Sequence, residues 1–119
     1  MNDKKIGLWK EYYQNGIIKS TKLIQNDTAI IHRSFFPNGN VNLQGTKINN
    51  KRSGKWTSFH ENGQVASEGF YKENTKEGKW TSFHENGTKN AEGNYILGKR
   101  QGHWIFFDNN GAFRSSGDF

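Results

Sequence analysis

The sequence has 119 residues, of which 31% are apolar and 14% aromatic, and its net charge is +6. This length favours one domain, and the absence of cysteine excludes disulfides, thiolate catalysis and cysteine metal sites. The low apolar fraction is typical of disorder, but four tryptophans predict an ordered, thin structure in which aromatic side chains supply most of the burial. No apolar run is long enough for a signal peptide or a membrane span, so we expect a cytoplasmic protein.

An Asn-Gly pair recurs along the chain at nearly constant spacing. It stands at 15–16, 38–39, 62–63, 86–87 and 110–111, at intervals of 23, 24, 24 and 24 residues. This spacing predicts one domain, 1–119, of five repeats of about 24 residues, which span approximately 7–29, 30–53, 54–77, 78–101 and 102–119.

In chain order, the first two repeats are degenerate and the last three follow one pattern. The first begins GLWKEYYQNG, and Lys22 stands where later repeats have glycine in the second strand. The second has Ile30 and His32 in place of Gly and Trp. The third and fourth share the decapeptide GKWTSFHENG unchanged, and the fifth begins GHWIFFDNNG. A hairpin does not require the Lys, Thr, Ser, His or Glu of this decapeptide, so their identity indicates recent duplication or a surface presented twice.

Each repeat is predicted to be a β-hairpin, because Asn-Gly suits a two-residue type I′ turn with positive φ at both residues. Two-residue turns place large rings opposite glycines, so that each ring can cover the bare backbone across the pair. The predicted pairs are His32–Gly45, Trp56–Gly69, Trp80–Gly93 and Trp104–Gly117. We therefore predict an all-β fold, a repetitive antiparallel β-hairpin meander of about ten strands that forms one elongated twisted sheet.

Because side chains alternate along a strand, the two faces of this sheet differ. The Trp face carries the tryptophans, the glycines opposite them and tyrosines such as Tyr71, together with Val41, Val65 and Phe113. The Phe face carries an aromatic stripe beside polar and charged residues. The residues of this stripe are Tyr12, Phe35, Phe59, Phe83 and Phe107.

No constellation in the sequence indicates catalysis or metal binding. His60 and His84 are repeat copies about 10 Å apart, at two strand spacings, too far to share a zinc ion with bonds of about 2 Å. The glutamates are also repeat copies in equivalent environments, whereas a catalytic pair needs two different ones. We therefore expect no enzyme activity, no cofactor and no metal ion.

Basic residues gather in the connections between repeats, along one long edge of the predicted sheet. This basic edge includes Lys51, Arg52, Lys76, Lys99 and Arg100. Such an edge keeps a sheet soluble, and it also suits an acidic partner. Aromatics among lysines also occur in single-strand nucleic-acid binding, but the repeat already accounts for the aromatics, so we expect no nucleic-acid partner.

The pattern G-x-W-x-x-F/Y-x-x-N-G followed by E-G-x-Y resembles the MORN repeat variant family of bacteria. The match is strong at GKWTSFHENGQVASEGFY, GKWTSFHENGTKNAEGNY and GHWIFFDNNGAFRSSGDF and weak at GLWKEYYQNG, and IIHRSFFPNGNVNLQGTK departs most. The resemblance implies β-hairpin repeats and an antitoxin or immunity role, since many members neutralise a toxin encoded beside them. Related MORN repeats are associated with membrane lipids and protein scaffolding.

We therefore expect a non-enzymatic immunity protein that binds and neutralises a cognate toxin domain with an acidic surface. The expected contact residues are the aromatic stripe together with Lys55 and Lys79. An alternative is a peripheral lipid-binding or protein-scaffolding module that uses the basic edge. Homo-oligomerisation through the terminal strands or an exposed aromatic face is compatible with either interpretation.

Overall fold

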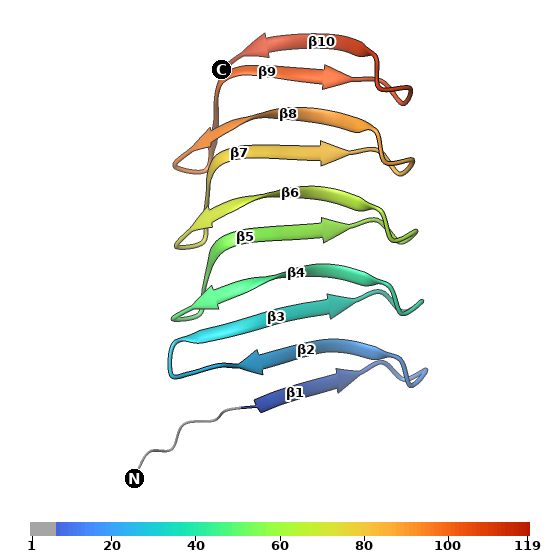
Figure 1. The fold of residues 1–119 in the computed structure, drawn as a ribbon, viewed down its shortest axis with the longest axis vertical. Helices are drawn as coiled ribbons and strands as arrows, with labels where there is room; N and C mark the ends of the chain where they lie inside the picture. The colour runs from blue at the N-terminus through green and yellow to red at the C-terminus, as the bar shows by residue number, and fades with distance from the viewer. Residues whose placement is uncertain (1–6) are drawn as a thin grey trace.

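The computed structural model describes residues 7–119, which form one antiparallel sheet of ten strands (Figure 1). Each strand pairs with its neighbours in sequence, and the molecule measures 56 × 34 × 16 Å. The strands are β1 (Gly7–Tyr12), β2 (Ile18–Ile24), β3 (Ala29–Phe35), β4 (Val41–Ile48), β5 (Lys51–Phe59), β6 (Val65–Lys72), β7 (Thr75–Phe83), β8 (Lys89–Ile96), β9 (Lys99–Phe107) and β10 (Phe113–Asp118). The predicted all-β meander is confirmed. Nothing in the described range is a helix of the length and apolarity needed to cross a membrane.

The predicted strand register is confirmed in the second to fifth repeats. Trp56 pairs with Gly69, and the equivalent pairs in the other repeats also form. These pairs are His32 with Gly45, Trp80 with Gly93 and Trp104 with Gly117. The first repeat keeps the same register although Lys22 replaces the glycine opposite Trp9.

The predicted geometry of the Asn-Gly turns is wrong. In the third repeat, Gly63 N–H donates to the His60 carbonyl at 3.0 Å, and His60 N–H donates to the Gln64 carbonyl at 2.8 Å. Gly63 has a φ of 92°, and Asn62 does not have a positive φ. The loop is therefore a three-residue one, in which only the glycine takes the left-handed conformation. A bulge beside Phe59 absorbs the extra residue and restores the predicted register.

Type I′ turns occur instead along the opposite long edge of the sheet. There, two consecutive residues with positive φ join β4 to β5, β6 to β7 and β8 to β9. These loops are Asn49–Asn50, Glu73–Asn74 and Leu97–Gly98. Within the last three repeats, one long edge thus has three-residue loops and the opposite edge has two-residue loops. Both kinds of loop contain residues that accept positive φ.

The bulges also move some side chains to the other face. Val65 pairs with Phe59 and therefore lies on the Phe face. Val41 and Phe113 hold the equivalent positions beside the stripe. The prediction that these three residues belong to the Trp face is wrong, because one extra residue shifts the alternation.

Candidate functional site

On the Trp face, each of the last three tryptophans covers a glycine of the preceding repeat. Trp80 pairs with Gly93, but its ring lies over Gly69, where a Cβ would stand 2.1 Å from the ring atom Cδ2. We call this arrangement the Trp–Gly contact. It recurs as Trp56 over Gly45 and Trp104 over Gly93. The ring therefore joins two repeats, instead of covering the backbone within its own hairpin as predicted.

A second glycine, two residues before each of these tryptophans, makes the contact possible. Gly78 has a φ of 81°, which side chains rarely tolerate. The strand pairing shifts at this point, where β6 meets β7. The shift lets the ring of Trp80 turn back onto Gly69, and Nε1 donates to the Phe70 carbonyl at 3.0 Å. Trp80 is consequently 7% exposed although the sheet has a single layer.

The tryptophans alternate with tyrosines in a continuous row of rings across the repeats. Trp80 meets Tyr71 and Tyr95 edge to face, with centroids 5.2 and 6.1 Å apart. The Nζ of Lys76 lies over the rings of Trp80 and Tyr95, 4.6 Å from the centroid of the first and 4.9 Å from that of the second. This geometry is that of a cation–π interaction.

The same cation position is occupied in the repeats on either side. Arg52 lies 4.7 Å from the centroid of Trp56, and Arg100 lies 5.0 Å from that of Trp104. Three of the five residues assigned to the basic edge thus stack on rings of the Trp face. Lys51 and Lys99 are exposed.

His32 takes the place of a tryptophan in the second repeat. Its ring stacks on Trp56, with centroids 6.1 Å apart and planes inclined by 30°. Burial lowers the pKa of His32 below its ordinary value of 6.5, and the cations Lys47, Lys22 and Arg52 lower it further. The carboxylate of Glu11 opposes this shift. The folded chain therefore favours the neutral form of the imidazole.

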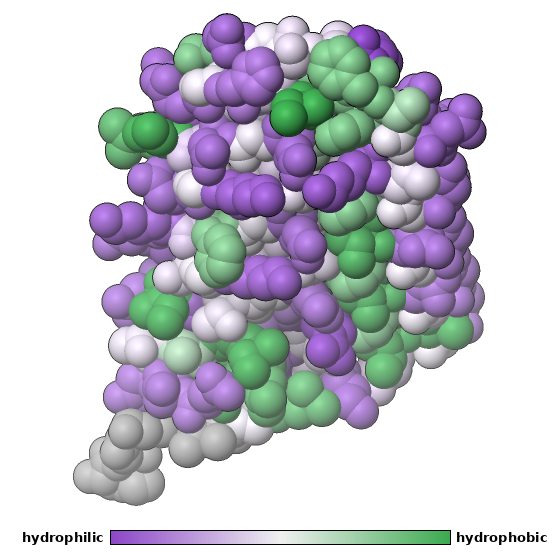
Figure 2. Space-filling model, turned by 45° about the horizontal axis from the view of Figure 1, so that its top comes forward, coloured by the Kyte–Doolittle hydropathy of each residue, from purple (hydrophilic) through white to green (hydrophobic). Residues whose placement is uncertain are grey.

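The Phe face carries the predicted stripe together with paired charges. Tyr12 is 57% exposed, and the four phenylalanines of the stripe are half-buried. Lys55 Nζ lies 3.4 Å from a carboxylate oxygen of Glu68, and Lys79 Nζ lies 3.8 Å from that of Glu92. Figure 2 shows a hydrophobic band along the long axis of the molecule with hydrophilic side chains beside it. The structure thus places the stripe and both predicted lysines on one face.

The Phe face also carries large apolar side chains that were not among the predicted contact residues. Phe70 and Ile96 are each 52% exposed, and Ile48 is 41% exposed. Phe70 and Ile96 directly neighbour Tyr71 and Tyr95, which stack with tryptophans, so alternation turns them to the Phe face. These positions do not repeat: the equivalents of Phe70 in β4 and β8 are Thr and Asn, and Ile48 and Ile96 correspond to a Lys in β6. A search for positions that are apolar in every repeat therefore does not find them.

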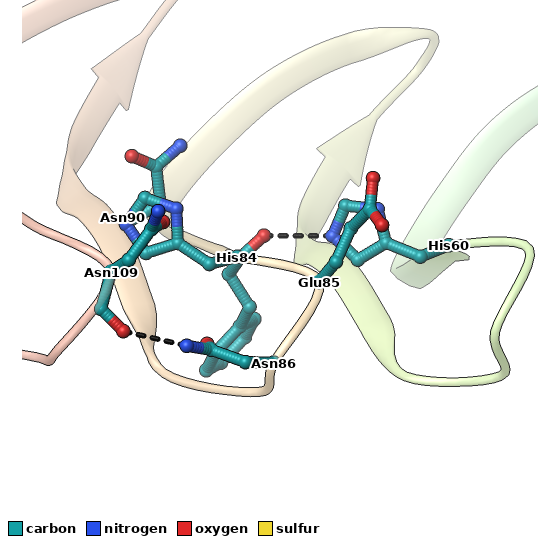
Figure 3. A pocket seen from close by; sticks show the side chains of 7 residues that line it. His60, His84, Glu85, Asn86, Asn90 and Asn109 are labelled. Carbon is teal, nitrogen blue, oxygen red and sulfur yellow. Dashed lines mark hydrogen bonds between the residues drawn. The ribbon is translucent and has the colours of Figure 1, made fainter.

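The repeated histidines join neighbouring repeats at the Asn-Gly edge (Figure 3). The Nε2 of His60 lies 2.8 Å from the Phe83 carbonyl, and that of His84 lies 3.0 Å from the Phe107 carbonyl. A carbonyl only accepts hydrogen bonds, so each Nε2 carries the hydrogen. In the first repeat, Tyr13 makes the equivalent bond. The histidine of the decapeptide therefore has a structural role between repeats, while the hairpin itself does not require it, since the hairpins with Phe36 and Asp108 at this position also form.

The asparagines of the turns add a second set of bonds between repeats. Asn62 Nδ2 donates to the Glu85 carbonyl at 2.7 Å, and its Oδ1 accepts from Gln64 N–H within its own turn at 2.9 Å. Asn86 repeats both contacts one repeat later. An open hollow of about 520 Å³ lies beside the Asn86 turn, and its lining includes His60, His84 and Asn109. Among residues 7–119, no group of three or more His, Asp or Glu side chains is arranged to hold a metal ion.

Comparisons with known proteins agree with this architecture. The model of the MORN repeat variant family matches residues 5–26, 52–73 and 76–96, which together make up more than half of the chain. The crystal structure of TarM has a TM-score of 0.52 and 16% identity, over 85% of this chain and 20% of TarM. A mutant of S. aureus TarM in complex with fondaparinux, α-GlcNAc-glycerol and UDP has a TM-score of 0.53 and 14% identity, with the same coverage.

The chain thus spans about a fifth of the length of these solved structures, and a likeness at such low identity shows the fold alone. No curated protein matches the chain. The three matched segments cover nearly all of the hairpins β1–β2, β5–β6 and β7–β8, and Trp56 and Trp80 of the last two make the Trp–Gly contact. The chain therefore belongs to the MORN repeat variant family.

Proposed function

We propose that this chain is a non-enzymatic immunity protein of the antitoxin type, which binds a cognate toxin domain through its Phe face. The observation that carries the proposal is the exposure of this face. It presents the half-buried aromatic stripe and the exposed side chains of Ile48, Phe70 and Ile96, and no other element of the described sheet covers them. Exposed apolar surface of this kind marks interaction sites in soluble proteins.

The composition of the Phe face suits a protein partner. Aromatic anchors dominate the energy of protein interfaces when they enter a pocket of the partner, and Phe70 is available at 52% exposure. The side chains of Lys55 and Lys79 are 58% and 68% exposed, so they can attract an acidic toxin surface. The net charge of +6 acts in the same direction. Membership of a family with many immunity components supports the toxin as the partner.

The first experiment identifies the partner. The tagged chain is purified from its native cells, bound proteins are identified by mass spectrometry, and the neighbouring open reading frame is co-expressed. We expect one stoichiometric protein that is toxic when expressed alone and harmless beside this chain. Recovery of lipids or membrane proteins alone would contradict the immunity proposal. It would favour the peripheral lipid-binding or scaffolding module, which binds anionic vesicles with a steep dependence on salt.

The second experiment tests the face with a matched pair of variants. Phe70→Ser removes an exposed ring from the Phe face, and Phe119→Ser removes a ring of similar exposure, 54%, from the Trp face. We expect calorimetry to show at least about a tenfold loss of toxin affinity for the first variant and less than about a twofold change for the second. Equal losses, with circular dichroism unchanged, would show that the Phe face is not the contact surface.

A further inference from the structure

The two outer strands of the sheet each carry one half of a Trp–Gly contact. Gly117 in β10 corresponds to the glycines at 45, 69 and 93, but no tryptophan of the described residues lies over it. The nearest atoms to a Cβ built there belong to Phe119, at 3.7 Å. At the other end, Trp9 in β1 is 54% exposed, whereas Trp56, Trp80 and Trp104 are at most 7% exposed.

The beginning of β1 has a glycine with positive φ at the position that the contact uses in the other repeats. Gly7 stands two residues before Trp9 and has a φ of 133°. The glycines before the three buried tryptophans also have positive φ, between 71° and 81°. Gly7–Trp9 therefore repeats the Gly-x-Trp segment of β5, β7 and β9, and none of the described glycines has the Trp9 ring over it.

We propose that β1 of a second copy of this chain docks against the outer edge of β10, so that its Trp9 covers Gly117. Odd-numbered strands run antiparallel to even-numbered strands throughout the meander, so the incoming strand continues the existing pattern. Inside the sheet, the indole donates to the carbonyl one residue after the covered glycine, as Trp80 does to Phe70. At the new junction that acceptor is the carbonyl of Asp118.

The side chains at this junction are compatible with the pairing. At the β8–β9 junction, Ile105 and Phe106, which follow Trp104, lie opposite Glu92 and Ala91. At the proposed junction, the residues that follow Trp9 are Lys10 and Glu11, and they lie opposite Ser116 and Ser115 of the first copy. Small uncharged serines oppose no like charge, so the junction carries no electrostatic penalty between directly paired residues.

The contact is head to tail and does not close on itself, so it produces chains of increasing length. Analytical ultracentrifugation of the full chain is therefore expected to show a weight-average mass that rises with protein concentration. Two variants each disrupt one side of the proposed contact. Gly117→Ala places a Cβ where the incoming indole would lie, and Trp9→Ala removes the indole.

Neither variant is expected to unfold the chain. Gly117 does not have a positive φ, and the new Cβ makes only an ordinary contact with Phe119. Trp9 is more than half exposed. Circular dichroism and thermal unfolding of each variant provide the check. Each variant alone is expected to remain monomeric at concentrations where the wild-type chain associates.

Mixing the two variants distinguishes this contact from any other mode of association. The Trp9→Ala variant keeps an intact β10 edge, and the Gly117→Ala variant keeps an intact β1 edge. The mixture is therefore expected to form a one-to-one dimer and nothing longer. A wild-type chain that stays monomeric at all concentrations would overturn the proposal. So would association that persists in both single variants, as in pairing through the Phe face, or a mixture that remains monomeric.

Discussion

The ring of Trp80 lies so close to Gly69 that a Cβ on the glycine would stand 2.1 Å from the ring atom Cδ2. Gly69 does not have a positive φ, so the backbone conformation at this position would accept other residues. The requirement for glycine comes instead from a tryptophan in the next repeat. The repeat pattern therefore records contacts between units as well as the folding of each hairpin.

Gly69→Ala is expected to lower the free energy of unfolding by about 1–3 kcal/mol, because the methyl group forces the indole out of its place. Urea denaturation followed by tryptophan fluorescence measures the change. Gly117→Ala is the matched control, since no tryptophan of the same copy covers that glycine, and at concentrations too low for copies to associate it is expected to change stability by less than about 0.5 kcal/mol. Equal stability of the two variants would contradict the Trp–Gly contact.

Asn62→Ala is expected to lower the free energy of unfolding by about 1–2 kcal/mol, because it removes one bond within the turn and one to the Glu85 carbonyl. Asn110 holds the same position in the last turn, where its backbone N–H bonds to Asp108 but no hydrogen bond of its side chain is observed in the described structure. Asn110→Ala should therefore cost less than half as much. Chemical denaturation of both variants tests the difference. An equal loss would show that the bond between repeats contributes nothing.

The lowered pKa of His32 predicts a specific dependence of stability on pH. The unfolded chain protonates this histidine near its ordinary pKa of 6.5, whereas the folded chain protonates it only at lower pH. Below 6.5 the unfolded state therefore binds more protons, and the contribution of His32 to stability is lost as the pH falls towards the folded pKa. Urea denaturation between about pH 7.5 and about pH 5 should show a shallower loss for His32→Gln than for the wild type. Identical pH profiles would exclude this role.

Lys76→Ser is expected to reduce stability by about 1 kcal/mol, because Lys76 lies over the rings of both Trp80 and Tyr95. Lys76→Arg should preserve stability, since arginine occupies this position in the neighbouring repeats. Lys72→Ser, at an exposed position nearby, is the control for loss of a positive charge. Thermal unfolding of the three variants provides the measurement. A loss for Lys72→Ser equal to that for Lys76→Ser would assign the effect to net charge alone.

The strand register could be predicted from the sequence because two local departures compensate. The Asn-Gly loop has three residues instead of two, which shifts the strand pairing by one residue. The bulge beside Phe59 reverses this shift, so that from Ser58 away from the loop the strands pair as predicted. Trp56 therefore still pairs with Gly69. The same departures move Val65 to the Phe face, where simple alternation from a two-residue turn does not place it.

The contacts between repeats could not be predicted in the same way. The residue spacing within a hairpin gives Gly93 as the strand partner of Trp80, but it does not show towards which neighbouring strand the indole turns after a bulge. The roles of His60 and Asn62 also depend on carbonyls more than twenty residues away. On the Phe face, the periodic stripe was visible in the sequence, whereas the exposure of Phe70 depends on an unrepeated side chain.

The position of these contacts bears on how such a chain changes its length. Each junction between the last three repeats uses a glycine and a carbonyl from the unit before and a tryptophan from the unit after. A unit inserted between residues 77 and 78 by gene duplication would bring both halves of this contact with it, so every old junction would be preserved and one identical junction added. Loss of an internal unit would be equally harmless to its neighbours. The unchanged decapeptide in the third and fourth repeats is what such an insertion leaves behind, and lineages of this chain are expected to differ by whole units of 24 residues.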